Sequence, residues 1–210
     1  MRVSKTPYGD VAAVIIIGNG PRDLRILATI ATKYNHKKLL LHVQLPPPYS
    51  ARKGLGAALE ATYYVLTRCE ACNHVLIVID KEHLPVSEKL KKELLRHGIH
   101  AENIKKHESG LIEIDASLYM PGHQRKARIL IAPQGHYKSI EENLAALIRL
   151  LYGEQVKPSK EDVNKWLRRH RLRDNELVEK ADKDILEKAF PSLTHALKLL
   201  ATHRDTHIHH

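Results

Sequence analysis

Residues 11–21 read Val-Ala-Ala-Val-Ile-Ile-Ile-Gly-Asn-Gly-Pro, and this stretch decides the fold. The continuous apolar run over 11–17 predicts a strand buried on both faces, as in parallel sheets. Gly18 ends that strand, and Pro21 suits the first turn of a helix. Apolar residues at helical spacing then extend the helix to about Tyr34. The chain therefore opens with a strand–turn–helix unit.

The same alternation continues downstream. We expect further strands over 39–44 and 74–79, with helices over about 55–66 and 87–96. Each of these strands is short and apolar, and each is followed by a helix that carries leucines on one face. Alternation of this kind predicts parallel strands that are joined by crossover helices.

Beyond residue 100 the pattern changes. Three strands without intervening helices are predicted around Ile104, over 111–116 and over 127–132. In the second of these, isoleucines alternate with acidic residues, which is typical of a strand with one wet face. Ser109-Gly110 predicts the turn between the first two strands.

From Ser139 onward the sequence predicts helices. Ser139 with Glu142 forms a capping-box pattern at the start of the first helix. Ser159 caps a second helix together with Asp162, and Ser192 begins the last one.

These elements predict an α/β fold, namely a three-layer, open, largely parallel sheet of Rossmann-like or Toprim-like type with a C-terminal helical extension. We expect an α/β domain over 1–152, the helical extension over 153–202 and a flexible His-rich tail over 203–210. The helices of the extension could also mediate assembly into a homo-oligomer.

Composition describes an ordinary globular protein, with 43% hydrophobic and 28% charged residues among 210. No apolar run approaches the roughly 18 residues that span a bilayer. The first residues lack the apolar region of a secretory signal. We therefore expect a cytoplasmic protein without a membrane partner.

The net charge is +10 with the histidines neutral, and most of the excess lies in the first 150 residues. A basic excess favours a polyanionic partner such as nucleic acid. The alternative is the Lys- and Glu-rich surface of a thermophile protein.

Cys69 and Cys72 are the two cysteines, in the pattern Cys-x-x-Cys. They could be half of a zinc site completed by His74 and a distant histidine, or a redox pair. They could also be two cysteines between a helix and a buried strand, or, in a hot intracellular environment, a disulfide.

In open parallel sheets, ligands bind outside the carboxyl ends of the strands. This rule brings four polar residues to one edge: Asn19, Asp23, Asp80 and Glu82. Two kinds of site are possible at this edge, a dinucleotide-binding site and a Mg²⁺ site.

The glycine turn after the first strand invites a dinucleotide site. However, the third glycine of that fingerprint is replaced by Asp23, whose charge would face a pyrophosphate. The alternative is a tight turn at a helix start.

Asp80 and Glu82 end a buried strand and could share Mg²⁺, which prefers oxygen ligands. Otherwise Asp80 caps a loop and Glu82 is solvated.

Three segments, 17–27, 75–82 and 129–144, together resemble Toprim domains. The first is similar to the opening motif, a strand followed by a helix that begins Pro-x-Asp-x-x-x-Leu. The second resembles the motif in which a strand ends in Asp-x-Asp. The third is similar to a strand, loop and helix in small stand-alone Toprim proteins related to the nuclease half of the OLD family. The resemblance covers roughly residues 10–150.

The resemblance implies phosphodiester chemistry with Mg²⁺ or Mn²⁺. Asp80 and Glu82 would hold the metal, and Glu141 would add a ligand or orient water. Asn19 stands where the family has an acid/base glutamate, and an amide cannot exchange a proton near neutral pH.

Phosphate or nucleic-acid contacts are expected from the glycine turn and from basic side chains near loops, although such groups could also be merely solvated. The candidates are Gly18, Gly20, Arg22, Arg25, Arg52, Lys53, Arg125 and Lys126.

We therefore expect a Toprim-like protein that binds, and could cleave, nucleic acid with Mg²⁺. The alternatives are a non-catalytic nucleic-acid or nucleotide-binding module, and an oligomeric structural or regulatory protein.

Overall fold

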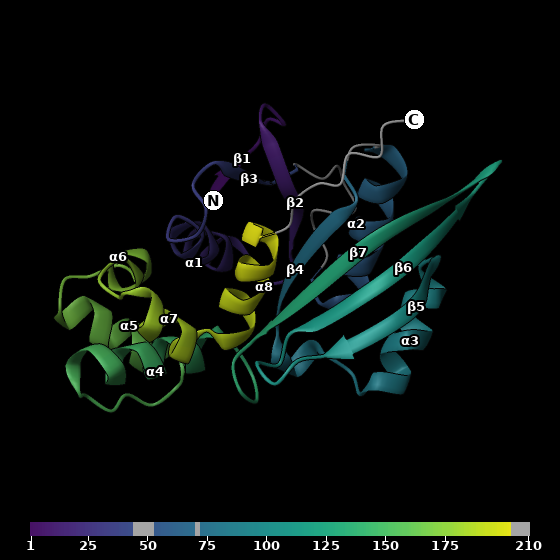
Figure 1. Cartoon of the computed structure of the whole chain (residues 1–210). Coiled ribbons are helices and arrows are strands. Elements are labelled where there is room, and N and C mark those ends of the chain that lie inside the picture. Colours follow the sequence, from purple (N-terminus) through teal and green to yellow (C-terminus); the bar gives the residue numbers. More distant parts are fainter. Residues whose placement is uncertain (44–52, 70–71, 203–210) are drawn as a thin grey trace.

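The computed structural model describes residues 1–43, 53–69 and 72–202. A seven-stranded sheet in the order β1-β3-β2-β4-β7-β6-β5 forms its centre. The first five strands in this order are mutually parallel, and β6 is antiparallel to both of its neighbours. Helices cover both faces of the sheet, and a group of helices follows it (Figure 1). The predicted α/β class, with a largely parallel sheet and C-terminal helices, is confirmed.

The strands are β1 (Arg2–Ser4), β2 (Asp10–Ile17), β3 (Lys38–Leu41), β4 (His74–Asp80), β5 (Ile99–Lys106), β6 (Ile112–Met120) and β7 (His123–Gln134). The helices are α1 (Pro21–Ala31), α2 (Leu55–Arg68), α3 (Ser87–Arg96), α4 (Ile140–Tyr152), α5 (Lys160–Arg169), α6 (Asp174–Glu179), α7 (Lys183–Ala189) and α8 (Pro191–Thr202), with a 3₁₀ turn η1 (Lys81–His83).

The sheet buries a different hydrophobic core against each face, because successive strand residues point to opposite sides. On one face, Ile16 and Ile77 pack with α2 and α3. On the other face, Ile15 and Leu76 pack with α1 and with the helices that follow β7. Residues of β2 are buried on both faces, which is why its sequence is apolar without alternation.

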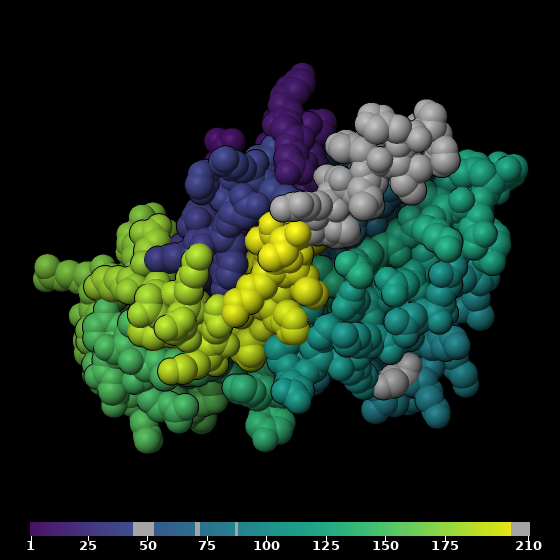
Figure 2. All heavy atoms as spheres, in the orientation of Figure 1, coloured from purple at the N-terminus to yellow at the C-terminus, as the bar shows by residue number. Residues whose placement is uncertain are grey.

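The C-terminal helices continue the core on the α1 side. Trp166, Leu177, Phe190 and Leu197 belong to the same buried cluster as Ile15. Helix α6 contacts α1, and α8 contacts β7 and β2. In the space-filling view these helices and α1 form one continuous body (Figure 2). Within the described residues, no helix combines the length and apolar content required to cross a membrane.

Several boundaries differ from the predicted ones. Helix α1 ends at Ala31, three residues before the expected end. Strand β5 already begins at Ile99, five residues before Ile104. This start was not predicted because β5 is the edge strand of the sheet, and its exposed polar residues show no apolar alternation. The short elements β1, α6 and α7 were not predicted, since three to seven residues are too few to establish a period.

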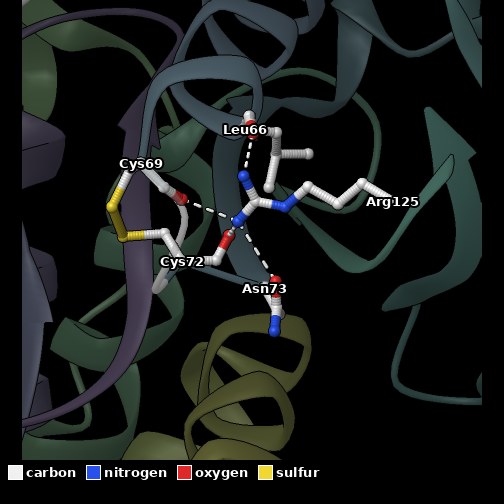
Figure 3. Close-up of a disulfide and its surroundings, with 5 residues drawn as sticks. All are labelled: Leu66, Cys69, Cys72, Asn73 and Arg125. Carbon is white, nitrogen blue, oxygen red and sulfur yellow. Dashed lines mark hydrogen bonds between the residues drawn. A yellow bond between two sulfur atoms is a disulfide. The ribbon is translucent and has the colours of Figure 1, made fainter. Parts of the chain in front are cut away.

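Cys69 and Cys72 form a disulfide just after α2 (Figure 3). The Arg125 guanidinium, from β7, faces this turn. It donates to the carbonyl of Leu66, to the carbonyls of Cys69 and Cys72 at 2.6 and 3.0 Å, and to Asn73 Oδ1 at 3.1 Å. These bonds give hydrogen-bond donors to one carbonyl in the last turn of α2, where carbonyls lack helical partners, and to two carbonyls just after it. Of the alternatives for the two cysteines, the structure therefore has the disulfide.

Candidate functional site

Three adjacent parallel strands end at the same edge of the sheet. Residue Ile17 of β2 pairs with Val78 of β4, and Asp80 at the end of β4 pairs with Gln134 at the end of β7. Each strand leads directly into a polar segment: the glycine turn, η1 and the loop over 135–139. Side chains from all three segments therefore lie near one another.

Asp23, in the first turn of α1, is the most buried carboxylate of this edge, with 4% of its surface exposed. Its Oδ2 atom has no hydrogen-bond partner among the described residues. Burial, followed by the negative charge of Asp80, raises the pKa of Asp23 to about 7, although Asn19 acts in the opposite direction. A carboxylic acid with this pKa can take up and release protons near neutral pH.

Asp80 is half-buried at the end of β4. Its Oδ1 accepts a hydrogen bond of 3.1 Å from the backbone N–H of Ile140, the first residue of α4. The pKa of Asp80 is raised to about 6, mainly by burial and to a smaller extent by the charge of Glu141, while this hydrogen bond acts in the opposite direction. Asp23, Asp80 and Glu141 therefore interact electrostatically as one group.

Glu82 and His83 lie beside Asp80 and are exposed. One possible ligand atom from each of these three residues falls within 4.8 Å of the other two. Two carboxylates and an imidazole suit Mn²⁺ or a similar divalent ion, and the carboxylates alone suit Mg²⁺. The expected pair of Asp80 and Glu82 is thus close enough to share one ion, and His83 adds a ligand that the sequence analysis did not name.

Asn19 and Gln134 flank the carboxylates with unpaired amides. Asn19 Nδ2 and Gln134 Oε1 are both buried without a hydrogen-bond partner among the described residues. The Gln134 side chain is 1% exposed, and its Nε2 donates to Ala132 at 3.1 Å. Buried polar atoms in folded proteins are nearly always paired. Asn19, Asp23 and Gln134 each keep one such unpaired atom, so this edge concentrates uncompensated buried polar groups.

Glu141 is held in place by Arg22. Arg22 Nη1 donates to Glu141 Oε1 at 3.0 Å, and Ser139 Oγ donates to Glu141 Oε2 at 2.7 Å. The same guanidinium pairs with Asp174 at 3.2 Å and donates to Asn164 at 3.2 Å. The first turn of α1 is thus joined to α4, α5 and α6 by one side chain.

The loop over 135–139 is fixed by two residues of α4. Asn143 Oδ1 accepts from the Gly135 N–H at 2.5 Å. The Glu142 carboxylate accepts from the N–H groups of the next three residues, 136–138, at 2.6 to 3.2 Å. The predicted capping box is therefore wrong: Ser139 bonds to Glu141, and Glu142 holds the loop. The second predicted cap is confirmed, since Ser159 accepts from the Asp162 N–H at 3.1 Å.

The expected phosphate contacts are scattered rather than gathered. Arg22 is engaged in the ion pairs described above, and Arg25 pairs with Asp174 at 3.3 Å while remaining 56% exposed. Arg125 binds the carbonyls after α2, and Lys126 is exposed beside it. Gln134 lies eight positions after Lys126 in β7, which is about 26 Å along a strand.

Lys53 is exposed close to the start of α2, whereas Arg52 lies outside the described residues. Gly18 uses its backbone within the fold, donating to Val78 at 2.8 Å and accepting from the Gly54 N–H at 3.1 Å. Gly20 precedes α1 with φ 154°, in the region that favours glycine. Of the predicted phosphate-binding groups, Gly18, Gly20 and Arg22 adjoin Asn19 and Asp23 in the chain, and Lys53 precedes Gly54, which bonds to Gly18.

The order of strands and helices in the sequence predicts that Asp23 lies at this edge, but Asp23 was not among the predicted site residues. Its place in the first turn of a helix after a buried strand was the available signal. Gln134 gave no signal, because its burial depends on packing against residues far away in the chain.

Comparison of the chain with protein-family models, with curated proteins and with solved structures finds no match. The resemblance to Toprim domains stays a prediction from three short segments of the sequence.

Proposed function

We propose that this protein binds a divalent cation at the acidic edge and uses it to bind nucleic-acid phosphodiesters, as the resemblance to Toprim domains implies. Asp80, Glu82 and His83 would hold the cation. Glu141, whose two oxygens bond to Arg22 and Ser139, would orient a water molecule rather than bind the cation directly. A bound Mg²⁺ or Mn²⁺ would supply positive charge to a phosphoryl oxygen. The net charge of +10 favours a polyanionic partner.

The observation that carries the proposal is the buried Asp23 carboxylate, which has an unpaired oxygen and is surrounded by other acids. Clustered carboxylates at a buried position are costly unless a cation or a proton compensates them. A cation held by Asp80 and Glu82 would offset the negative charge beside Asp23 and so lower this cost.

Asp23 also bears on whether the protein turns over its substrate. Asn19 cannot act as a general base, but the Asp23 carboxyl, beside it and with a pKa of about 7, can. We propose Asp23 as the proton-exchanging group if phosphodiester cleavage occurs. Without cleavage, the replacement of the glutamate by Asn19 favours the second function, a nucleic-acid or nucleotide-binding module.

The test is calorimetric titration of Mn²⁺ and Mg²⁺ into the wild type and into Asp80→Asn. We expect binding by the wild type and a loss of at least ten-fold in affinity for the variant. Glu161→Gln, which removes an exposed carboxylate in α5, serves as the matched control and should bind like the wild type. Equal isotherms for the wild type and Asp80→Asn would refute the metal site.

Cleavage is tested separately with end-labelled single- and double-stranded oligonucleotides in the presence of Mn²⁺. Asp23→Asn should abolish any cleavage, and Asn19→Glu should increase it. An active wild type whose cleavage survives Asp23→Asn would exclude Asp23 as the acid/base group.

A further inference from the structure

A polar cavity of about 710 Å³ lies next to the acidic edge, between the start of α2 and the end of α3. Its polar lining comes from Lys53, Glu60, His83, Glu93, Arg96 and His97. Four of these six side chains carry nitrogen donors and two carry carboxylates.

The cavity is joined to the candidate metal site by two direct links. His83 lines the cavity and also belongs to the group with Asp80 and Glu82. On the α2 side, the Gly54 N–H donates to the Gly18 carbonyl at 3.1 Å. This bond fixes the chain beside Lys53 to the turn that carries Asn19. A ligand in the cavity would therefore lie beside whatever occupies the acidic edge.

The charges in the cavity favour an anion. Lys53 and Arg96 are the cationic side chains of the cavity, and among the described residues the Lys53 side chain makes no ion pair. Arg96 meets Glu93 at 3.9 Å with 78% of its side chain exposed. Such a long, exposed pair contributes little and is easily exchanged for another partner.

The two carboxylates do not cancel this preference. The Glu93 carboxylate has a nitrogen group beside each oxygen: Arg96 lies 3.9 Å from Oε1, and His97 Nε2 lies 3.8 Å from Oε2. The Glu60 carboxylate also lines the cavity, and its negative charge opposes an anion there. The imidazoles of His83 and His97 can each donate a hydrogen bond from a ring N–H to an oxygen of a ligand.

We propose that this cavity is a phosphate subsite, which holds a phosphoryl group of the bound polynucleotide next to the one at the acidic edge. Lys53 and Arg96 would pair with its oxygens, and His83 would lie between the two groups. The identity of the ligand as nucleic acid rests on the proposed function, whereas the preference of the cavity for a phosphoryl group does not.

The test uses inorganic pyrophosphate as the probe, titrated by calorimetry in the presence of EDTA so that no metal contributes. The wild type should bind it, and the double variant Lys53→Gln/Arg96→Gln should bind at least ten-fold more weakly. The matched control Lys37→Gln/Arg168→Gln removes one lysine and one arginine that are exposed elsewhere, and it should bind like the wild type. Thermal unfolding verifies that all of the variants fold.

Absence of binding by the wild type, or equal binding by the double variant, would overturn the subsite. Asp80→Asn should retain pyrophosphate binding, since the subsite does not require the metal. The two proposals can therefore fail separately: loss of Mn²⁺ binding refutes the metal site, and loss of metal-free pyrophosphate binding refutes the subsite.

A single-stranded oligonucleotide extends the test to the polymer. If each cationic side chain neutralises one phosphate, the slope of log K against log[salt] should fall in magnitude by about 0.7 for each cationic side chain that is substituted. An unchanged slope in the double variant would contradict a role in backbone binding.

Discussion

Asp23 carries the largest electrostatic cost at the candidate site. Its pKa of about 7 in the folded protein, against 3.8 for an ordinary aspartate, means that the folded state retains a proton that the unfolded chain releases. The cost appears as the pH rises above about 4 and is complete above about 7. Residues at functional sites are often retained despite such costs.

We predict that Asp23→Asn raises the free energy of unfolding at pH 8, by on the order of 2–4 kcal/mol. Near pH 4 the difference should vanish, because the native aspartate is then neutral too. Urea unfolding at both pH values measures this. Asp184→Asn, at an exposed position, should give no such pH-dependent gain. An equal change at both pH values would show that the pKa of Asp23 is not raised.

Gly135 is the residue on which the loop beside the site depends. Its φ is 83°, and a Cβ atom there would lie 2.5 Å from the Ser139 carbonyl oxygen and 2.6 Å from its nitrogen. Backbone atoms cannot move aside as a flexible side chain can. Gly122 has a similar φ of 85° with nothing within 4 Å of its Cβ position.

Comparison of Gly122→Ala with Gly135→Ala separates the cost of backbone strain from the cost of a steric clash. Gly122→Ala should cost about 1 kcal/mol, the usual cost of a left-handed conformation. Gly135→Ala should cost at least about 2 kcal/mol more and should also weaken Mn²⁺ binding, since Glu141 and Asp80 both contact this segment. Equal unfolding free energies for the two variants would refute the collision.

At the scale of elements, one side chain joins α1 to the helices that follow the sheet. The Arg22 side chain is 17% exposed and compensates Glu141 and Asp174, which are 14% and 9% exposed. Removing one member of such a group leaves buried charges without a partner. Arg22→Met should therefore destabilise the protein by about 3–5 kcal/mol.

Arg25→Met is the control for this prediction, because Arg25 pairs with the same Asp174 from an exposed position. It should cost no more than about 1 kcal/mol. Chemical denaturation measures both variants, and similar losses would mean that the Arg22 pairs are not the source of the effect.

Arg125 joins β7 to the end of α2 in a comparable way. Its bonds to the carbonyls after Leu66 and around the disulfide are charge-assisted, which makes them about twice as strong as neutral ones. Arg125→Met should lower the free energy of unfolding by about 1.5–3 kcal/mol. Lys126→Met, at the neighbouring exposed position, should change it by less than about 0.5 kcal/mol. A larger loss of stability for Lys126→Met than for Arg125→Met would contradict the stabilising role of the Arg125 hydrogen bonds.

At the scale of the whole molecule, the helices after residue 152 complete the core on the α1 side. Without them, α1 and α4 would lose their contacts with α6, α7 and α8, and Ile26, Ile30 and Leu144 would lose part of the buried cluster to which they belong. We predict that a chain ending at Tyr152 does not fold cooperatively, whereas a chain ending at Thr202 does. Thermal unfolding followed by circular dichroism distinguishes the two. A cooperative transition in the shorter chain would establish residues 1–152 as an independent domain.

Much of this architecture could be predicted, because it depends on local properties of the sequence. Apolar runs such as residues 11–17 and 74–79 predict buried strands, and glycine at the end of a strand predicts a turn. The order of strands and helices then brings Asn19, Asp23, Asp80 and Glu82 to one edge. The exposed strand β5 was predicted only in part and the short helices α6 and α7 not at all, because neither burial nor length imposes a readable period on them.

The sequence by itself determined the α/β class, the parallel arrangement of the central strands and the edge at which the acidic residues meet. The tertiary structure decided what those residues do there. Whether Asp23 is solvated or buried, and whether Arg22 is available to a ligand or paired with Asp174, 152 positions away, depends on packing between distant segments. Burial and ion pairing set the charge of a group, and both are properties of the folded chain rather than of any short stretch of it.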